Sequence, residues 1–209
     1  FCTLLLNTPP RLRSSVPLLS SSASAPHLNM SHVEPVQRTW AMAKNIDGFT
    51  DKFYERLFTI KPDYKTTLFG RTNIKAQSKM LASMLDTAVA NLENPDVLVP
   101  ALQELGMRHC RYGCRPEHYG PVGEALLWTI EFYLKDGFTK EVKDAWVTVY
   151  TTVVNVMTSQ NETEEGKRLL AEYEARYPSP KSHSGSGSAW KAAAVGVIAV
   201  AAIYFMRKK

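Results

Sequence analysis

A lone histidine ends an apolar helical stripe near the middle of this chain. The stripe consists of residues spaced by four, three and four positions, which places them on one face of an α-helix: Leu98, Leu102, Leu105 and His109. Gly113 suits the end of that helix. Pro116 and Glu117 suit the first turn of the next one, where a missing N–H costs nothing and a negative charge meets the helix dipole. His109 therefore points into a core just inside a helix end.

An inward histidine such as His109 has two common roles. It is most often structural and hydrogen-bonded within the core. Alternatively, a neutral imidazole binds a metal through one ring nitrogen while a carbonyl or carboxylate orients the other N–H. The stripe by itself favours the structural histidine, so the rest of the chain has to decide.

The remaining apolar residues also recur at helical spacing, and no segment alternates as strands do. We expect an all-α domain over 31–177, with helices over 35–47, 49–61, 77–94, 95–113, 116–136 and 140–156. Pro35 is expected in the first turn of the first helix, and Thr139 is expected as the N-cap of the last long one. The pattern fades over 161–177, where an extension of the last helix is the alternative.

Charge and cysteine content exclude two classes of protein. The net charge of +5 comes largely from the two ends of the chain, so we expect no basic face and no nucleic-acid partner. The three cysteines are Cys2, Cys110 and Cys114, an odd number without zinc-site spacing. They argue against a disulfide scaffold and favour a reducing compartment.

The two ends of the chain differ from the helical part. Residues 1–30 are rich in Ser, Leu and Pro and lack acidic residues, which favours translated upstream sequence over a transit peptide because Met30 is the first methionine. Residues 178–188 form a Pro-, Ser- and Gly-rich linker, which spans on the order of 20 Å as a flexible coil.

The last segment, 189–209, has an uncharged apolar run at 192–206 followed by three basic residues. That run reaches only about 22 Å against the roughly 30 Å hydrocarbon core, but Trp190 and Lys191 extend it. We expect a C-terminal transmembrane helix that tethers a cytosolic domain; a buried core helix is the alternative. Short tails with basic flanks resemble anchors of the mitochondrial outer membrane, with the endoplasmic reticulum as the alternative.

Four stretches of the chain resemble the globin domain of flavohaemoglobins and related single-domain globins. They are FYERLF (53–58), LGMRH (105–109), RPEHYGPVGEALL (115–127) and FTKEVKDAWVTVY (138–150). The resemblance covers residues 34–157 and implies a three-on-three globin fold that carries haem b.

The resemblance also implies roles for individual residues. His109 corresponds to the proximal haem iron ligand, the only metal ligand expected from the protein, and Phe69 to the phenylalanine that packs against the porphyrin. Tyr54, Gln77 and Leu81 fall where such globins line the distal side. Gln77 would otherwise be a polar residue reaching solvent at the head of an apolar face; with Tyr54 it is expected to hydrogen-bond bound dioxygen.

Further positions are expected to lie near the haem on its proximal side or at its edge. Tyr119 matches a tyrosine that joins the iron-bound histidine in a hydrogen-bonded set completed by a glutamate; counted from Trp146, the glutamate position falls on Thr163, between Glu162 and Glu164. Cys114 is expected at the haem edge, with a redox switch involving Cys110 as the alternative. Arg108 and Arg115 are expected near the haem propionates, with solvated surface charge as the alternative.

The function implied by the resemblance is reversible dioxygen binding. We expect nitric oxide dioxygenation with Tyr54 and Gln77 holding the dioxygen, and an external flavoprotein reductase as partner. Oxygen storage or transport, and a membrane-tethered redox or oxygen sensor, are the alternatives.

Overall fold

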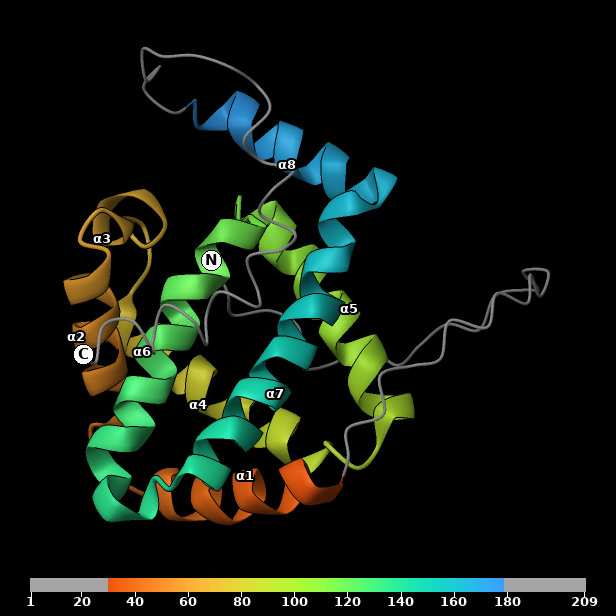
Figure 1. The fold of residues 1–209 in the computed structure, drawn as a ribbon. Helices are drawn as coiled ribbons and strands as arrows, with labels where there is room; N and C mark the ends of the chain where they lie inside the picture. Colours follow the sequence, from red (N-terminus) through yellow and green to blue (C-terminus); the bar gives the residue numbers. More distant parts are fainter. Residues whose placement is uncertain (1–29, 179–209) are drawn as a thin grey trace.

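The computed structural model describes residues 30–178, and this part of the chain is all-helical, as predicted (Figure 1). Its α-helices are α1 (Met30–Ala43), α2 (Phe49–Ile60), α3 (Tyr64–Thr67), α4 (Ile74–Ala90), α5 (Pro95–Arg111), α6 (Pro116–Leu134), α7 (Lys140–Thr158) and α8 (Glu164–Arg176). Two short 3₁₀ turns, η1 (Lys135–Gly137) and η2 (Ser159–Glu162), lie at either end of α7.

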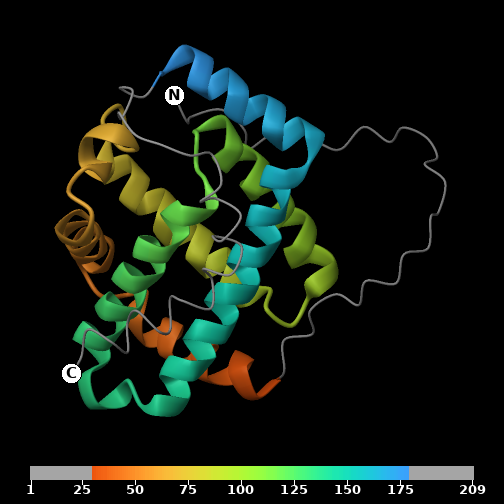
Figure 2. The same cartoon turned by 45° about the horizontal axis from the view of Figure 1, so that its top comes forward.

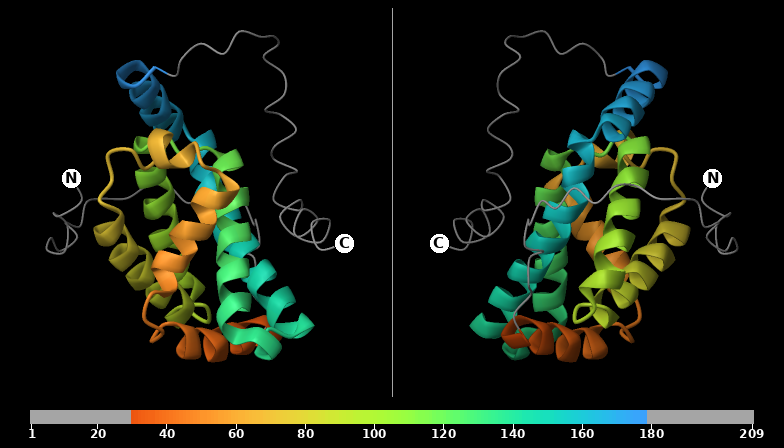
Figure 3. Two further views of the ribbon diagram at one scale, coloured as in Figure 1. Left: turned by 90° about the vertical axis from the view of Figure 1, so that its left-hand side faces the viewer. Right: turned by 90° about the vertical axis from the view of Figure 1, so that its right-hand side faces the viewer.

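The helices pack in crossed pairs rather than as a parallel bundle. α1 lies across one end of the molecule and packs on α7, and α2 packs on α6 (Figures 1 and 3). α5 packs on α7, η2 and α8, with α8 at the opposite end of the molecule from α1 (Figure 2). Within residues 30–178, α4 and α5 are not among the helix pairs that pack closely together, although a short loop joins them.

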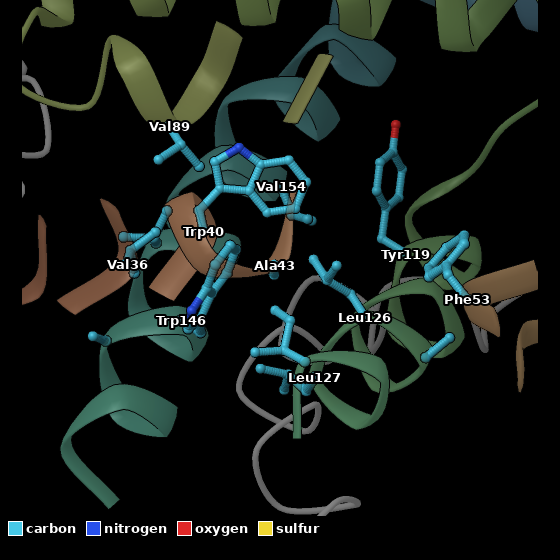
Figure 4. Close-up of a cluster of buried hydrophobic side chains, with 14 of the residues drawn as sticks. Val36, Trp40, Ala43, Phe53, Val89, Tyr119, Leu126, Leu127, Trp146 and Val154 are labelled. Carbon is cyan, nitrogen blue, oxygen red and sulfur yellow. The ribbon is translucent and has the colours of Figure 1, made fainter. Parts of the chain in front are cut away.

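The core lies where α1, α2, α6 and α7 meet. Trp40 and Trp146 meet edge to face with ring centroids 6.4 Å apart (Figure 4). The Trp146 Nε1–H donates to the Thr39 hydroxyl at 2.9 Å. All three side chains are 2% exposed, so this hydrogen bond is made without competition from water. It connects the first helix to the last long one.

Several helix ends follow from local sequence. The Thr139 side chain accepts a hydrogen bond from the Val142 N–H, which confirms the predicted N-cap of α7. Pro116 occupies the first turn of α6, also as predicted. Asn73 caps α4 in the same way as Thr139 caps α7.

The start of the first helix was predicted wrongly. α1 begins at Met30, so Pro35 lies inside the helix rather than in its first turn. Val33 and Val36 are both at most 1% exposed, so the buried face continues on both sides of the proline. We attribute the early start to this burial, which offsets the one backbone hydrogen bond that proline cannot donate.

The segment after α7 forms a helix of its own rather than extending α7. η2 interrupts the α-helix, and the Thr163 side chain then accepts from the Gly166 N–H to begin α8. The predicted fading of the pattern over 161–177 thus marks a cap followed by a new helix that buries Leu169.

Among residues 30–178, no helix is both long and apolar enough to cross a membrane. Residues 1–29 of the expected leader, residues 179–188 of the expected linker and the expected anchor over 189–209 lie outside the described residues. The anchor and its membrane stay predictions from the sequence.

Candidate functional site

His109 lies in the last turn of α5 with one ring nitrogen already engaged. Its Nδ1 lies 2.8 Å from the Leu105 carbonyl oxygen, one turn earlier in the same helix. A carbonyl only accepts, so Nδ1 carries the proton and Nε2 keeps a lone pair. Burial, assisted by the nearby Arg108 charge, lowers the pKa of His109 below its ordinary value of 6.5. The imidazole is therefore neutral at pH 7, as a metal ligand must be.

A tight turn at Gly113 and Cys114, referred to as the corner, follows His109. Gly113 adopts a left-handed φ of 74°, and the Cys114 N–H donates to the His109 carbonyl at 2.9 Å. The chain then turns into α6, which places the Tyr119 ring near the imidazole, with centroids 6.0 Å apart and planes 28° from parallel. Figure 4 shows the Tyr119 hydroxyl pointing away from Leu126 and Leu127. This hydroxyl is buried and has no hydrogen-bond partner among the described residues.

A second group of candidate residues forms an aromatic cluster around Tyr54 on α2. The Phe53 and Phe69 rings meet the Tyr54 ring edge to face at centroid distances of 5.0 and 5.6 Å, and the Phe58 ring lies 5.9 Å away. Phe69 lies in a loop, where an aromatic ring would be exposed without apolar neighbours, but it is partly buried against these rings. Tyr54 itself is only 4% exposed.

Gln77 and Tyr54 come together although they stand on different helices. The Gln77 side chain lowers the pKa of the Tyr54 hydroxyl, yet burial outweighs this interaction and raises that pKa well above its ordinary value of 10. Gln77 is partly buried in the first turns of α4, so its amide is not simply a solvated group at a helix start. The structure thus places a permanently protonated hydroxyl beside an amide in an apolar setting.

The helices that carry Gln77 and His109, α4 and α5, leave several apolar side chains only partly buried. α4 and α5 do not pack closely on each other, and Leu81, Leu85 and Leu105 on their inward stripes are only partly buried. His109 offers a single neutral nitrogen, which suits a metal that brings its other ligands with it, as a porphyrin iron does. The unpartnered Tyr119 hydroxyl beside His109 also marks this region as one where the protein alone leaves a polar group unsatisfied.

Comparison with known families agrees with this geometry. The profile of the globin family matches residues 51–157. The chain belongs to the globin family. Membership in this family implies a haem cofactor.

The relatives of this globin include flavohemoproteins. It is 32% identical to that of Bacillus subtilis over 111 residues, which is 52% of this chain and 28% of the relative. It is 34% identical to that of Rhizobium meliloti over 107 residues, 50% of this chain and 26% of the relative. The chain thus matches little more than a quarter of the length of these curated relatives.

A solved structure resembles the globin more completely. A Pseudomonas aeruginosa protein, described as structurally highly homologous to human haemoglobin, superposes with a TM-score of 0.55 at 25% identity. The similarity covers 61% of this chain and 96% of that one.

Three further residues were expected near the haem: Leu81, Arg108 and Arg115. Leu81 packs against the core, one turn after Gln77. Arg108 forms an ion pair with Glu104 at 2.5 Å with its side chain 41% exposed, and Arg115 pairs with Glu174 on α8. Both arginines therefore have partners on the protein surface, which agrees with the alternative of solvated surface charge.

The two cysteines near His109 are unsuited to a redox switch. Burial raises the pKa of the Cys114 thiol to about 12 and also raises that of Cys110. Because α5 ends at Arg111 and Gly113 turns the chain, the two residues do not share a helical face. Protonated thiols react poorly, so the structure favours packing roles for both.

Glu162 and Glu164, which flank the expected glutamate position, make no hydrogen bond to the Tyr119 hydroxyl. Glu162 and Glu164 are exposed, and the Thr163 hydroxyl is used to cap α8. Asn161 was not expected near the site from the sequence; it is 7% exposed and donates from Nδ2 to the Cys114 carbonyl at 3.0 Å. The sequence does contain a sign of its position. Asn161 follows the buried Val154 and Met157 by seven and four residues, so it continues the inward face of α7 into η2.

Proposed function

We propose that this globin binds haem b through His109 and converts nitric oxide and dioxygen to nitrate, using electrons from a separate flavoprotein reductase. The observation that carries the proposal is the Tyr54 hydroxyl, which is buried in the aromatic cluster and interacts with Gln77 from α4. The flavohemoprotein relatives support the choice of chemistry, although the match covers about a quarter of their length.

On the proximal side, His109 would hold the iron. Its Nε2 is the free nitrogen, and the Nδ1 hydrogen bond to Leu105 selects the tautomer and restrains ring rotation. When bound, the haem supplies reversible dioxygen binding and the one-electron step by which nitric oxide, dioxygen and one electron give nitrate. Burial of the imidazole keeps it neutral and available through the physiological pH range.

On the distal side, Tyr54 and Gln77 would bind the diatomic ligand. Both carry N–H or O–H donors, which would bind a diatomic ligand with partial negative charge more strongly than an uncharged one. The raised pKa of Tyr54 keeps its hydroxyl a donor at any physiological pH. The Phe53, Phe58 and Phe69 rings exclude water and so strengthen these hydrogen bonds.

A second function, oxygen storage or transport, is favoured by one observation. The Pseudomonas aeruginosa structure, similar to this chain over 96% of its own length, is described as homologous to human haemoglobin. A storage globin would bind dioxygen reversibly through the same residues but would react slowly with nitric oxide.

The test of the proposed function is a single turnover in the full-length protein. The oxygenated ferrous protein is mixed with nitric oxide in a stopped-flow instrument, and nitrate is measured. We expect conversion to the ferric spectrum with one nitrate per haem. Rapid dioxygen binding without nitrate formation would instead establish the storage function.

His109→Ala should lack the haem spectrum altogether. His118→Gln is the matched control, because His118 caps the Arg115 N–H at 3.0 Å without being an expected ligand. Haem binding by His109→Ala with the parent spectrum would contradict the proposal.

A further inference from the structure

We infer that η2 and α8, which lie beyond the residues matched to the globin family, position the iron ligand; Asn161 and Tyr173 are the positioning residues. The inference rests on the proposed role of His109 as the haem ligand. It assigns a function to a part of the chain that the globin profile does not cover.

The first contact is a relay of two hydrogen bonds. The buried Asn161 amide donates to the Cys114 carbonyl at 3.0 Å, and the Cys114 N–H donates to the His109 carbonyl at 2.9 Å. Because Asn161 is 47 residues from Cys114 in sequence, this bond restrains the corner from a different element. A shift of η2 is therefore transmitted to the backbone of the ligand itself.

The second contact is steric. The Tyr173 ring of α8 lies so close to Gly113 that a Cβ at Gly113 would overlap it. Gly113 also has the left-handed φ that turns the chain after α5. The Tyr173 ring thus packs on Gly113, the residue whose left-handed conformation turns the chain.

α8 is itself held at two further points. Glu174 pairs with Arg115 at the start of α6, and the Arg71 guanidinium lies 3.9 Å from the Tyr177 ring centroid. Arg71 belongs to the loop between α3 and α4, so α8 connects the His109 corner to the segment that carries Phe69 (Figures 1 and 2). The exposed Arg115 pair adds little by itself. The contacts of Asn161 with Cys114 and of Tyr173 with Gly113 are the ones that restrain the corner directly.

The experiment separates positioning from ordinary stabilisation in the full-length holoprotein. Asn161→Ala removes the donor, Asn161→Asp keeps the shape but lacks the N–H at neutral pH, and Tyr173→Leu removes the ring from Gly113. Thr39→Val is the matched control, because it removes an equally buried hydrogen bond, from Trp146, in a different part of the core.

The readouts are the iron–histidine stretching band of the ferrous protein by resonance Raman spectroscopy and the rate of haem transfer to apomyoglobin. We expect the three test variants to shift or broaden the band, and Asn161→Ala to accelerate haem loss about fivefold, the worth of one net hydrogen bond. Thr39→Val should lower the melting temperature without either change. An unchanged band and haem-loss rate in the test variants, or equal changes in the control, would overturn the inference.

Hydrogen exchange at the Cys114 amide adds a readout that needs no haem: exchange should be faster in Asn161→Ala, and unchanged exchange would also overturn the inference. If haem binds but nitrate is not formed, the proposed function fails while the Raman band still decides the inference. If the parent protein binds no haem, both fail together.

Discussion

At the scale of single residues, burial rather than hydrogen bonding sets the protonation states in this globin. Tyr54, Tyr119 and Tyr150 all have pKa values raised by loss of hydration, although interactions with Gln77 and with the Gly123 backbone lower the pKa of Tyr54 and Tyr150 respectively. Loss of hydration disfavours the charged form, so the same burial lowers the pKa of His109. Hydroxyl donors and a neutral imidazole are the forms that ligand and iron binding require.

Replacing Tyr54 by Phe tests the distal role directly. The variant keeps the aromatic contacts with Phe53 and Phe69 but loses the hydroxyl donor. Dioxygen should dissociate about ten- to hundredfold faster, because a hydrogen bond to a charged group contributes about 1.5–3 kcal/mol. Flash photolysis or stopped-flow displacement by carbon monoxide measures this rate.

Tyr64→Phe serves as the control for that experiment. Tyr64 is a similarly buried tyrosine, 6% exposed, but lies on α3 with its ring 5.6 Å from His118. Its dioxygen dissociation rate should equal that of the parent protein. Equal rates in Tyr54→Phe and the parent would remove Tyr54 from the ligand site.

At the scale of elements, the end of α5 depends both on its own sequence and on the neighbouring helix α8. The backbone turns at Gly113 because glycine alone accepts the positive φ without strain, and α8 then covers the turn with Tyr173. Local sequence therefore explains where α5 ends, while packing explains why the corner has one conformation.

A pair of glycine substitutions tests this dependence. Gly113→Ala adds a Cβ that strains the backbone and overlaps the Tyr173 ring, so the free energy of unfolding should fall by about 1–3 kcal/mol. Gly120→Ala, within α6, meets nothing within 4 Å and should raise it by about 0.5–1 kcal/mol. Urea denaturation followed by circular dichroism measures both. A neutral Gly113→Ala would show that the corner is not tightly packed.

At the scale of the whole molecule, the neutral histidines make stability depend on pH. Burial lowers the pKa of both His109 and His118 below 6.5 in the folded state. The unfolded chain therefore binds more protons once the pH falls below about 6.5, and stability decreases as the pH falls further towards the folded pKa values. Above that pH both states are neutral, and these two groups make no contribution.

The haem-free protein should accordingly lose stability between pH 7 and pH 5, by up to about 1.4 kcal/mol per pH unit for each histidine. Urea unfolding at half-unit intervals measures the slope. His109→Gln should show a shallower slope than the parent, because one of the two groups no longer titrates. A variant slope equal to that of the parent would show that His109 is not buried in the neutral form.

The sequence by itself determined the helical class, the starts of α2, α5, α6 and α7 and the inward position of His109, because helix periodicity and caps are properties of neighbouring residues. It also placed Tyr54 and Gln77 on their helices through resemblance to other globins. The tertiary structure alone decided which side chains meet: Tyr54 with Gln77, Asn161 with Cys114, and Tyr173 with Gly113. A buried donor or ring takes its partner from whichever helix packs against it, and periodicity along one helix contains no information about that choice.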